Sequence, residues 1–350
     1  MPEAETIKPY CLHPAQTAEE REAVYTFRYL HYYCHLAGAP GVDHAAQRVY
    51  SPHDEESVHL TGCGKKGELF IVGTGTRAST PNLPTEWKEL LCLERLAPLG
   101  LDSILIFSRL VEHSAYHGSP AFADFFKYAA RYFTERGYAY SIHYCAPAVV
   151  PLYERIGFRV YGGGYTLPSG LYRTPMLLLP SDTTRLGRTL AAFSNATEGV
   201  IIRDDLEKAL ALLPELATPP LCAMSAEACL ALVRAYLGKN EGNGSVPAAS
   251  VPDSAGRLLR RAAIFPLQTG DSPIHANDDP LLWFLLEGYC RAVDSADKEI
   301  LVRPGMFINA YACKAFTAME PGRVLFFTPK GKNFAAEAAV LPPSFWSRLV

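Results

Sequence analysis

Acid–base side chains cluster at the end of the apolar segment 103–113. The segment ends in Glu112 and His113, and His117 follows shortly after it. A glutamate can accept a proton through a water molecule, and histidine titrates near neutral pH. Glu94 offers a second such carboxylate upstream. Each acid also fits an ordinary solvated surface position, and the histidine spacing is not that of a metal site.

A second apolar segment, 138–144, carries His143 and is followed directly by Cys145. A thiol beside an imidazole could act as a nucleophile, although a buried structural cysteine explains the same residue. The nine cysteines of the chain lack CxxC pairs and His/Cys ligand spacing. This pattern favours reduced thiols over disulfides or zinc, with packing as the default role and no metal expected.

Length and charge limit the class of protein. A chain of 350 residues can form two domains joined by a connector, and 49% hydrophobic with 20% charged residues is an ordinary soluble composition. The formal charge of −3 gives no basic field for nucleic acid. The first residues lack a secretory signal pattern, and no apolar run reaches membrane-span length. We therefore expect a cytoplasmic protein that binds no nucleic acid.

Periodicity and turn residues divide the chain into elements that would position these groups. We expect a helix at 16–37 that Thr17 caps, and a mixed α/β unit through residue 182. Its strands are predicted at 57–61, 68–78, 103–113, 138–144, 158–162 and 172–179, with helices at 121–136 and 148–156.

The rest of the chain is predicted to form a helical connector followed by a smaller β domain. Residues 183–256 form a connector with helices at 183–194, 203–213 and 225–237, followed by a Gly/Ser/Pro-rich linker at 237–256. Residues 257–350 form a smaller β domain of short strands, preceded by a helix at 255–262. The expected domains are thus 1–182, 183–256 and 257–350.

The sequence LYERIGFRVYG at 152–162 follows a strand that ends at Cys145. This order resembles the closing half of the GCN5-related N-acyltransferase (GNAT) fold. The resemblance implies two splayed parallel strands that hold an acyl thioester between them, with strand amides around 109–111 polarising its carbonyl. It also implies that Tyr153 protonates the departing thiolate, although a half-buried aromatic on an amphipathic helix fits equally well.

Four short segments in the first half keep the order of one branch of that family. They contain Arg28, then Asp54 with Glu56, then Arg77, and then Ser108-Arg109. The order resembles the acyl-homoserine lactone synthases and the long-chain N-acyl amino acid synthases. The arginines could hold a carboxylate or phosphate, or Arg28 and Arg109 could pair internally with the two acids. The resemblance implies substrate contacts at Arg28, Asp54, Glu56, Arg77 and Cys145, and catalytic roles for Ser108 and Arg109.

The loop before the predicted helix at 121–136 departs from the family. It reads YHGSPAF at 116–122, with one glycine, a proline and a bulky Phe122, and is a poor cradle for a diphosphate. A single phosphate, as on phosphopantetheine, would suit it better. Cofactor contacts are therefore expected at His117, Gly118 and Ser119, with Leu110 and Val111 on the strand. Ile106 replaces a glutamate usual in lactone synthases, so lactone formation is not expected.

The C-terminal region resembles the β-roll of cyclic-nucleotide-binding domains. Two of its sequence motifs are matched here, by Leu285 through Val293 and by Pro304-Gly305-Met306-Phe307. Ile308 and Asn309 stand where such pockets have Gly and Glu, with Lys314 as the remaining cation. We therefore expect an accessory domain that binds no cyclic nucleotide.

These inferences predict an N-acyltransferase. It would move a medium or long fatty acyl group from an acyl carrier protein, or from coenzyme A, to an amine such as an amino acid. No permanently bound cofactor is expected; the thioester is a co-substrate, and a homodimer is possible. The alternatives are a short-chain acetyl-coenzyme A dependent acetyltransferase and an inactive sensor or assembly protein.

Overall fold

The computed structural model describes part of the chain. The described residues are 10–33, 41–117, 119–162, 164–166, 172–182, 203–217, short stretches between 220 and 235, 262–272, 282–294, 296–304, 307–309 and 313–327.

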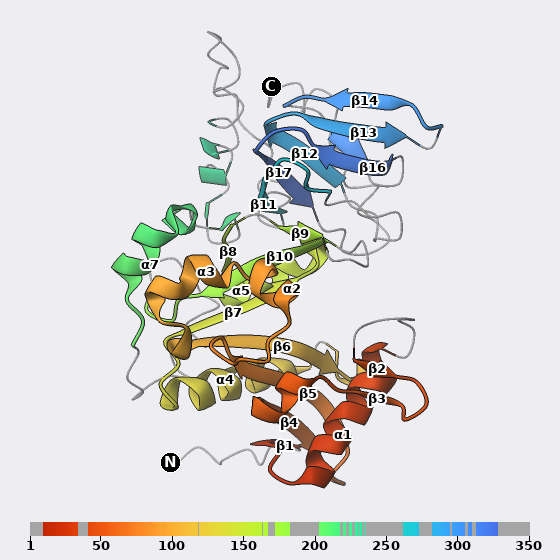
Figure 1. Cartoon of the computed structure of the whole chain (residues 1–350), viewed down its shortest axis with the longest axis vertical. Helices are drawn as coiled ribbons and strands as arrows, with labels where there is room; N and C mark the ends of the chain where they lie inside the picture. Colours follow the sequence, from red (N-terminus) through yellow and green to blue (C-terminus); the bar gives the residue numbers. More distant parts are fainter. Residues whose placement is uncertain are drawn as a thin grey trace, which may run out of the picture.

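One mixed sheet of eight strands organises the N-terminal half (Figure 1). Its order is β1-β4-β5-β6-β7-β10-β8, with β9 paired to β10, and among these described strands only the β6–β7 pair is parallel. The bounds are β1 Tyr10–Pro14, β4 Val58–Gly64, β5 Leu69–Arg77, β6 Ile104–Glu112, β7 Tyr140–Cys145, β8 Phe158–Val160, β9 Tyr165–Thr166 and β10 Tyr172–Leu178. The predicted mixed α/β fold is confirmed.

Helices cover both faces of this sheet. The α-helices are α1 Ala18–Arg28, α2 Thr85–Leu90, α3 Leu93–Leu96, α4 Pro120–Glu135, α5 Val150–Ile156 and α7 Leu206–Leu212. Short turns of other helix types are η1 Tyr29–Tyr33, η2 Pro52–Glu56, η3 Ala97–Leu99, η4 Leu101–Ser103, η5 Ser114–Tyr116, η6 Pro147–Val149 and η7 Pro214–Ala217. A small ribbon, β2 Val42–Asp43 with β3 Arg48–Val49, lies beside α1.

Alternation along β6 separates the two layers of the core. Leu105 and Phe107 pack against the aromatic face of α4. Ile104 and Ile106 point the other way, into the cluster formed with α2, α3 and α7. Because side chains in a strand alternate between faces, one apolar strand can join two cores. Every one of these four side chains is buried, which fixes the register of β6.

The capping prediction for the first helix is confirmed. The Thr17 hydroxyl accepts the amide of Glu20 at 3.1 Å, and the Glu20 carboxylate accepts the amide of Thr17 at 3.0 Å. This reciprocal pair satisfies two orphan donors at the helix start. The α-helix is shorter than predicted, because a π-helical turn follows Arg28; residues 34–40 lie outside the described part.

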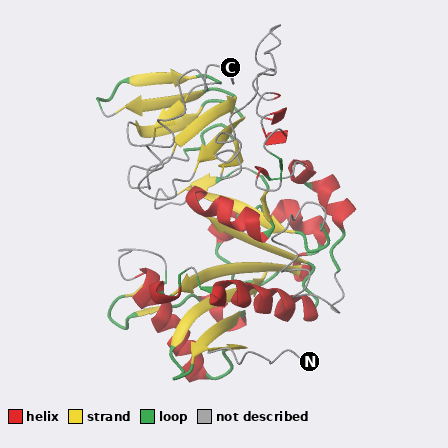
Figure 2. Cartoon of the chain, turned by 180° about the vertical axis from the view of Figure 1, so that it is seen from behind, coloured by secondary structure: helices red, strands yellow, loops and turns green. Residues whose placement is uncertain are grey.

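The C-terminal strands form two antiparallel sheets (Figures 1 and 2). One has the order β11-β17-β12-β15 and the other β14-β13-β16. The bounds are β11 Ala262–Leu267, β12 Leu282–Glu287, β13 Cys290–Asp294, β14 Glu299–Val302, β15 Phe307–Asn309, β16 Cys313–Ala318 and β17 Gly322–Phe327. Ile308 and Asn309 lie on β15, and residues 310–312 are outside the described part. The likeness to a cyclic-nucleotide domain stays a prediction.

A shared core joins the two halves. Phe158 and Met176 of the mixed sheet belong to the same buried cluster as Phe265, Trp283 and Phe316. In the connector, α7 corresponds to the predicted helix at 203–213. The predicted helix at 183–194, the linker at 237–256 and nearly all of the helix at 255–262 lie outside the described residues, as does much of 225–237. Within the described part of the chain, no helix has the length and apolar character of a membrane span.

Candidate functional site

The parallel strands β6 and β7 separate after a short paired stretch. Their pairing covers Ile104 with Tyr140, Leu105 with Ser141 and Ile106 with Ile142. Past these pairs β6 stays paired with β5, and β7 with β10. We call Phe107–Glu112 of β6 and His143–Cys145 of β7 the splayed strand ends; Figure 1 shows the two ribbons spreading apart. The facing edges therefore present backbone donors and acceptors that are not used between these strands.

A β-bulge lies in the splayed end of β6. Val72 pairs with Val111 and Thr74 with Ser108, so Gly73 faces both Arg109 and Leu110. Arg109 has a positive φ of 50°. Such a bulge changes the direction of a side chain and increases local twist. A Cβ on Gly73 would lie 2.8 Å from the Phe107 ring, so the close approach requires glycine.

The bulge directs Arg109 into a buried ion network. Asp54 of η2 accepts from Arg109 through Oδ2 and from Arg28 of α1 through Oδ1, the latter at 3.2 Å. Arg109 also donates to the Ser51 hydroxyl at 2.5 Å. Burial would raise the pKa of Asp54, but Arg109 and Arg28 outweigh it and hold this pKa below its usual range. Asp54 is thus an anion between two cations.

His59 and Thr74 complete the surroundings of Arg28. The guanidinium is fully buried, donates to the Thr74 hydroxyl and lies 3.0 Å from Nδ1 of His59. Burial, and then the Arg28 cation, lower the pKa of His59 to about 3. The imidazole is therefore neutral near pH 7, so its Nδ1 accepts from Arg28. A substrate carboxylate cannot reach Arg28 in this arrangement.

Trp87 of α2 lies between the two splayed strand ends. Its ring is 5.9 Å from the Arg109 guanidinium and 5.6 Å from the Tyr144 ring on β7. His53 packs against it at 4.7 Å, and burial followed by Arg109 lowers the pKa of this histidine to about 4. A cation–π contact on one strand and an edge-to-face contact on the other connect β6 to β7 through one indole.

Tyr153 of α5 lies beside the splayed end of β7. Its ring is 3.9 Å from the His143 ring, and Phe158 packs against both. Among the described residues neither nitrogen of His143 has a hydrogen-bond partner, and burial lowers the pKa of this histidine to about 3. Gly157 ends α5 at a φ of 111°, a left-handed conformation that suits glycine and allows the sharp exit into β8. A neutral imidazole and a phenol are therefore adjacent at this strand end.

Three polar groups in and beyond the splayed end of β6 are buried and make no hydrogen bond to the described part of the chain: the Ser108 hydroxyl, Oε1 of Glu112 and the Ser119 hydroxyl. Burial raises the pKa of Glu112, and its Oε2 lies 3.8 Å from His117 Nε2. Unpartnered buried polar atoms are uncommon in folded proteins and are found at binding and catalytic sites. Gly118 of the predicted loop is outside the described residues.

Some of the predicted site residues lie away from the Asp54 network. Arg77 is exposed at the far end of β5, 3.9 Å from Asp102, and Glu56 is exposed and accepts from Asn82 at 3.1 Å. Glu94 is exposed on α3. None of the three joins the Asp54 network, whereas Arg28 and Arg109 do.

Packing explains three further predicted residues. Cys145 is buried, its sulfur lies 3.6 Å from that of Met176, and burial raises the pKa of its thiol well above the ordinary value. A thiol in this state is a poor nucleophile at neutral pH. Leu110 and Val111 pack on opposite faces of β6, against the α4 and α1 clusters respectively.

An apolar cavity of about 50 Å³ lies between α4 and the paired part of β6 and β7. Its lining includes Leu105, Phe107, Ala129, Phe133 and Ser141. It is close to the point where the strands begin to separate, since Ile106 and Ile142 form the last pair. An apolar group inserted between the strands would therefore meet an apolar surface.

Sequence reasoning missed several members of the site. His59, Thr74 and Trp87 were not singled out, because an isolated histidine, threonine or tryptophan carries no spacing signal. The structure also brings Cys11, His13 and Cys63 together, with their ligand atoms within 4.8 Å of one another. Two adjacent strands supply these residues, so spacing along the chain could not reveal them.

No family model and no curated protein matches this sequence. Solved structures of acyltransferases resemble part of it at low identity. FeeM, an N-acyl amino acid synthase from uncultured soil microbes, is 14% identical with a TM-score of 0.42, over 53% of this chain and 100% of that one. The CoA-dependent acyl-homoserine lactone synthase BjaI is 12% identical with a TM-score of 0.43, over 58% and 97%. A chimera of the spermidine N-acetyltransferase SpeG from Vibrio cholerae and hSSAT is 14% identical with a TM-score of 0.34, over 50% of this chain and 98% of that one.

Proposed function

We propose that this chain is an N-acyltransferase that binds an acyl thioester between the splayed strand ends of β6 and β7. The observation that carries the proposal is the separation of two parallel strands directly after Ile106 and Ile142. An extended, amide-containing chain can hydrogen-bond to such free edges as an added strand does. Strand amides there can also polarise the thioester carbonyl.

The proposed reaction transfers the acyl group in one addition and one elimination. The amine nitrogen attacks the thioester carbon, the N–C bond forms, the C–S bond breaks, and the thiolate leaves with the bonding pair. The amine loses one proton and the thiolate gains one. Glu112 is the proposed base, because it is half-buried at the end of β6 with a raised pKa. Glu94, the other candidate, is exposed on α3.

Tyr153 is the proposed acid, because its ring lies against His143 at the splayed end of β7. The buried Ser108 hydroxyl, which bonds to none of the described residues, is available to a polar group of the substrate. Arg109 is a positioning residue: it is held by Asp54 and Ser51, and it keeps the bulge and Trp87 in place. The acceptor is an amine such as an amino acid.

The proposed donor is a fatty acyl group on an acyl carrier protein, or on coenzyme A. Helix α4 begins with Ser119 as its N-cap and Pro120 at its first position, and the Phe122 ring packs on Phe126 at 4.9 Å. Proline provides no amide donor, and bulky rings limit close approach to the backbone. These features favour a carrier with one phosphate over one with a diphosphate.

The size of the apolar cavity favours one alternative donor. A cavity of about 50 Å³ between α4 and the strands is smaller than the engineered cavity of about 150 Å³ that binds benzene. Without side-chain movement it suits a short acyl group. A short-chain acetyl-coenzyme A dependent acetyltransferase is therefore the second candidate.

The test is turnover measured by mass spectrometry. The full chain is incubated with a mixture of amino acids and with acyl carrier protein and coenzyme A thioesters of two to sixteen carbons. We expect an N-acylated product, and we expect Tyr153→Phe and Glu112→Gln to lower its rate by about 100-fold or more. Glu94→Gln is the matched control and keeps the rate. Absence of product with every thioester would reject the enzyme and favour a binding or assembly role.

A further inference from the structure

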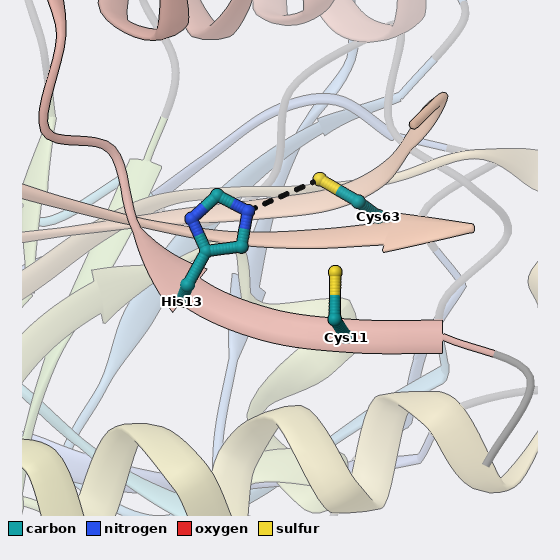
Figure 3. A group of neighbouring side chains, drawn as sticks. All are labelled: Cys11, His13 and Cys63. Carbon is teal, nitrogen blue, oxygen red and sulfur yellow. Dashed lines mark hydrogen bonds between the residues drawn. The ribbon is translucent and has the colours of Figure 1, made fainter. Parts of the chain in front are cut away.

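A cysteine–histidine cluster lies at the edge of the mixed sheet, on the strand pair β1–β4. Cys11 and His13 are two residues apart on β1, so their side chains share one face. Cys63 is the direct partner of Cys11 across the ladder, and Thr61 is the partner of His13. Figure 3 shows the three side chains converging, with Nε2 of His13 directed at Cys63. Their ligand atoms all lie within 4.8 Å of one another.

A hydrogen bond to the backbone favours one tautomer of His13. Its Nδ1 lies 3.1 Å from the carbonyl oxygen of Pro14, which can only accept, so this contact is a hydrogen bond in the tautomer with the proton on Nδ1. In that tautomer the lone pair is on Nε2, which lies 3.5 Å from Sγ of Cys63 and 3.4 Å from Oγ1 of Thr61. A ring N–H donated to a backbone carbonyl is the usual support for a metal-bound histidine, because it orients the ring and raises its basicity.

We propose that Cys11, His13 and Cys63 bind one zinc ion through two thiolates and Nε2. A tetrahedral zinc ion, with bonds of about 2.3 Å to sulfur and about 2.0 Å to nitrogen, separates a sulfur from a nitrogen by about 3.5 Å and two sulfurs by about 3.8 Å. The observed separation of 3.5 Å between His13 Nε2 and Cys63 Sγ has this length. Small movements of Cys11, which is exposed, would complete the triangle.

The cluster supplies three protein ligands within the described part of the chain. The nearest helix start offers Glu20, but its carboxylate accepts the amides of Gln16 at 2.6 Å and Thr17 at 3.0 Å as part of the α1 cap. The fourth position of the metal would therefore be taken by water or by an added ligand, as in open zinc sites. Burial increases from Cys11 to Cys63, so the ion would enter from the Cys11 side.

The metal would cross-link β1 to β4 at the edge of the mixed sheet. Among the described strands β1 pairs with β4 alone, and the chain continues from Pro14 at the end of β1 into α1, which carries Arg28. Cys63 lies on β4, the strand that also carries His59. A zinc ion that joins the two strands would hold α1 against the sheet and support the Arg28–Asp54 network. This role does not depend on the proposed acyl transfer.

The test measures zinc on the full chain without an affinity tag. The protein is treated with a phosphine reductant and a chelator, dialysed, and titrated with Zn²⁺ against a chromophoric chelator. Separately, Co²⁺ is added and the visible spectrum is recorded. We expect one equivalent of zinc, release of the two thiol protons to the buffer, and the thiolate charge-transfer and d–d bands of tetrahedral Co²⁺.

Variants assign the site. Cys11→Ser and His13→Gln should each lower zinc affinity by at least about tenfold. Cys313→Ser on β16 and His44→Gln beside Tyr29 are the controls and keep wild-type affinity. The Co²⁺ spectrum of the wild-type chain needs no variant, so it tests for tetrahedral thiolate coordination even if a variant fails to fold. No tight zinc on wild-type protein, equal affinity in Cys11→Ser, or a Cys11–Cys63 disulfide that persists under reductant would overturn the proposal.

Discussion

At the scale of single residues, the buried carboxylate of Asp54 holds the candidate site together. Both its oxygens are used, by Arg28 on one side and by Arg109 and the Ser51 amide on the other. Its side chain is fully buried. Two cations brought out of water are stable only while this anion lies between them. The network therefore fixes the bulge of β6 relative to α1.

Asp54→Asn should destabilise the fold strongly. It leaves two buried guanidinium groups without their anion, and breaking a buried pair from one side typically costs about 3–5 kcal/mol. Urea denaturation measures the change. Asp102→Asn, which removes the exposed partner of Arg77, is the matched control and should cost less than about 1 kcal/mol. Equal small losses in both variants would show that Asp54 does not organise the site.

His143 should make stability depend on pH. Burial holds its folded pKa at about 3, whereas the unfolded chain binds the proton near pH 6.5. Below about pH 6.5 the unfolded state binds more protons, so acidification destabilises the fold, by up to about 1.4 kcal/mol per pH unit from this group. His143→Leu should remove that part of the slope between pH 6.5 and 4. Phe158→Leu should lower stability at every pH and keep the slope; an unchanged slope in His143→Leu would contradict the assignment.

At the scale of elements, the sequence indicated the interior strands and the long helix well. The apolar runs that form β5 and β6 are nine residues long and contain several β-branched residues, and the cap of α1 has a specific four-residue signature. β1 was missed, because YCLHP is short, contains proline and lies at the sheet edge.

The same limit explains the candidate site. The sequence predicts Arg28, Asp54 and Arg109 as site residues. It equally predicts Arg77 and Glu56, which lie apart from them in the structure. Sequence does not specify a bulge, and a one-residue change of register moves each following side chain to the other face. Partners such as Trp87 and His59 come from tertiary packing, which has no local pattern.

Gly73→Ala tests the bulge as an element. The added methyl group would lie 2.8 Å from the Phe107 ring and 3.1 Å from that of Phe125, so β6 or α4 must shift. We expect a loss of about 1–3 kcal/mol in stability and a larger fall in any acyl-transfer rate than in acceptor binding. Gly67→Asn, in a turn with open space around it, is the control. Full stability and rate in Gly73→Ala would mean that the close approach is not required.

At the scale of the whole molecule, the C-terminal sheets are part of one core with the mixed sheet. Trp283 and Phe265 pack in the same cluster as Phe158 and Met176. α5 contacts β11 directly. The helix that carries Tyr153 is therefore supported from both halves of the chain, and the C-terminal strands stabilise the candidate site whether or not they bind a ligand.

Trp283→Ala should lower the stability of both halves together. Removing a fully buried tryptophan costs about 3–5 kcal/mol. Because the cluster is shared, we expect one calorimetric transition that moves to a lower temperature. Tyr289→Ala, at a side chain that is 43% exposed, should change the transition little. Two separate transitions, of which only one moves, would show that the halves fold independently.

The most direct test of the central claim locates the acyl group. The full chain is irradiated with a carrier-protein or coenzyme A thioester whose acyl chain carries a diazirine, and the adducts are mapped by tandem mass spectrometry. We predict adducts on Phe107–Glu112, on His143–Cys145 and on the face of α4 that lines the apolar cavity, and their loss when unlabelled thioester competes. Adducts confined to the C-terminal strands, or adducts that the competitor does not reduce, would contradict thioester binding between β6 and β7.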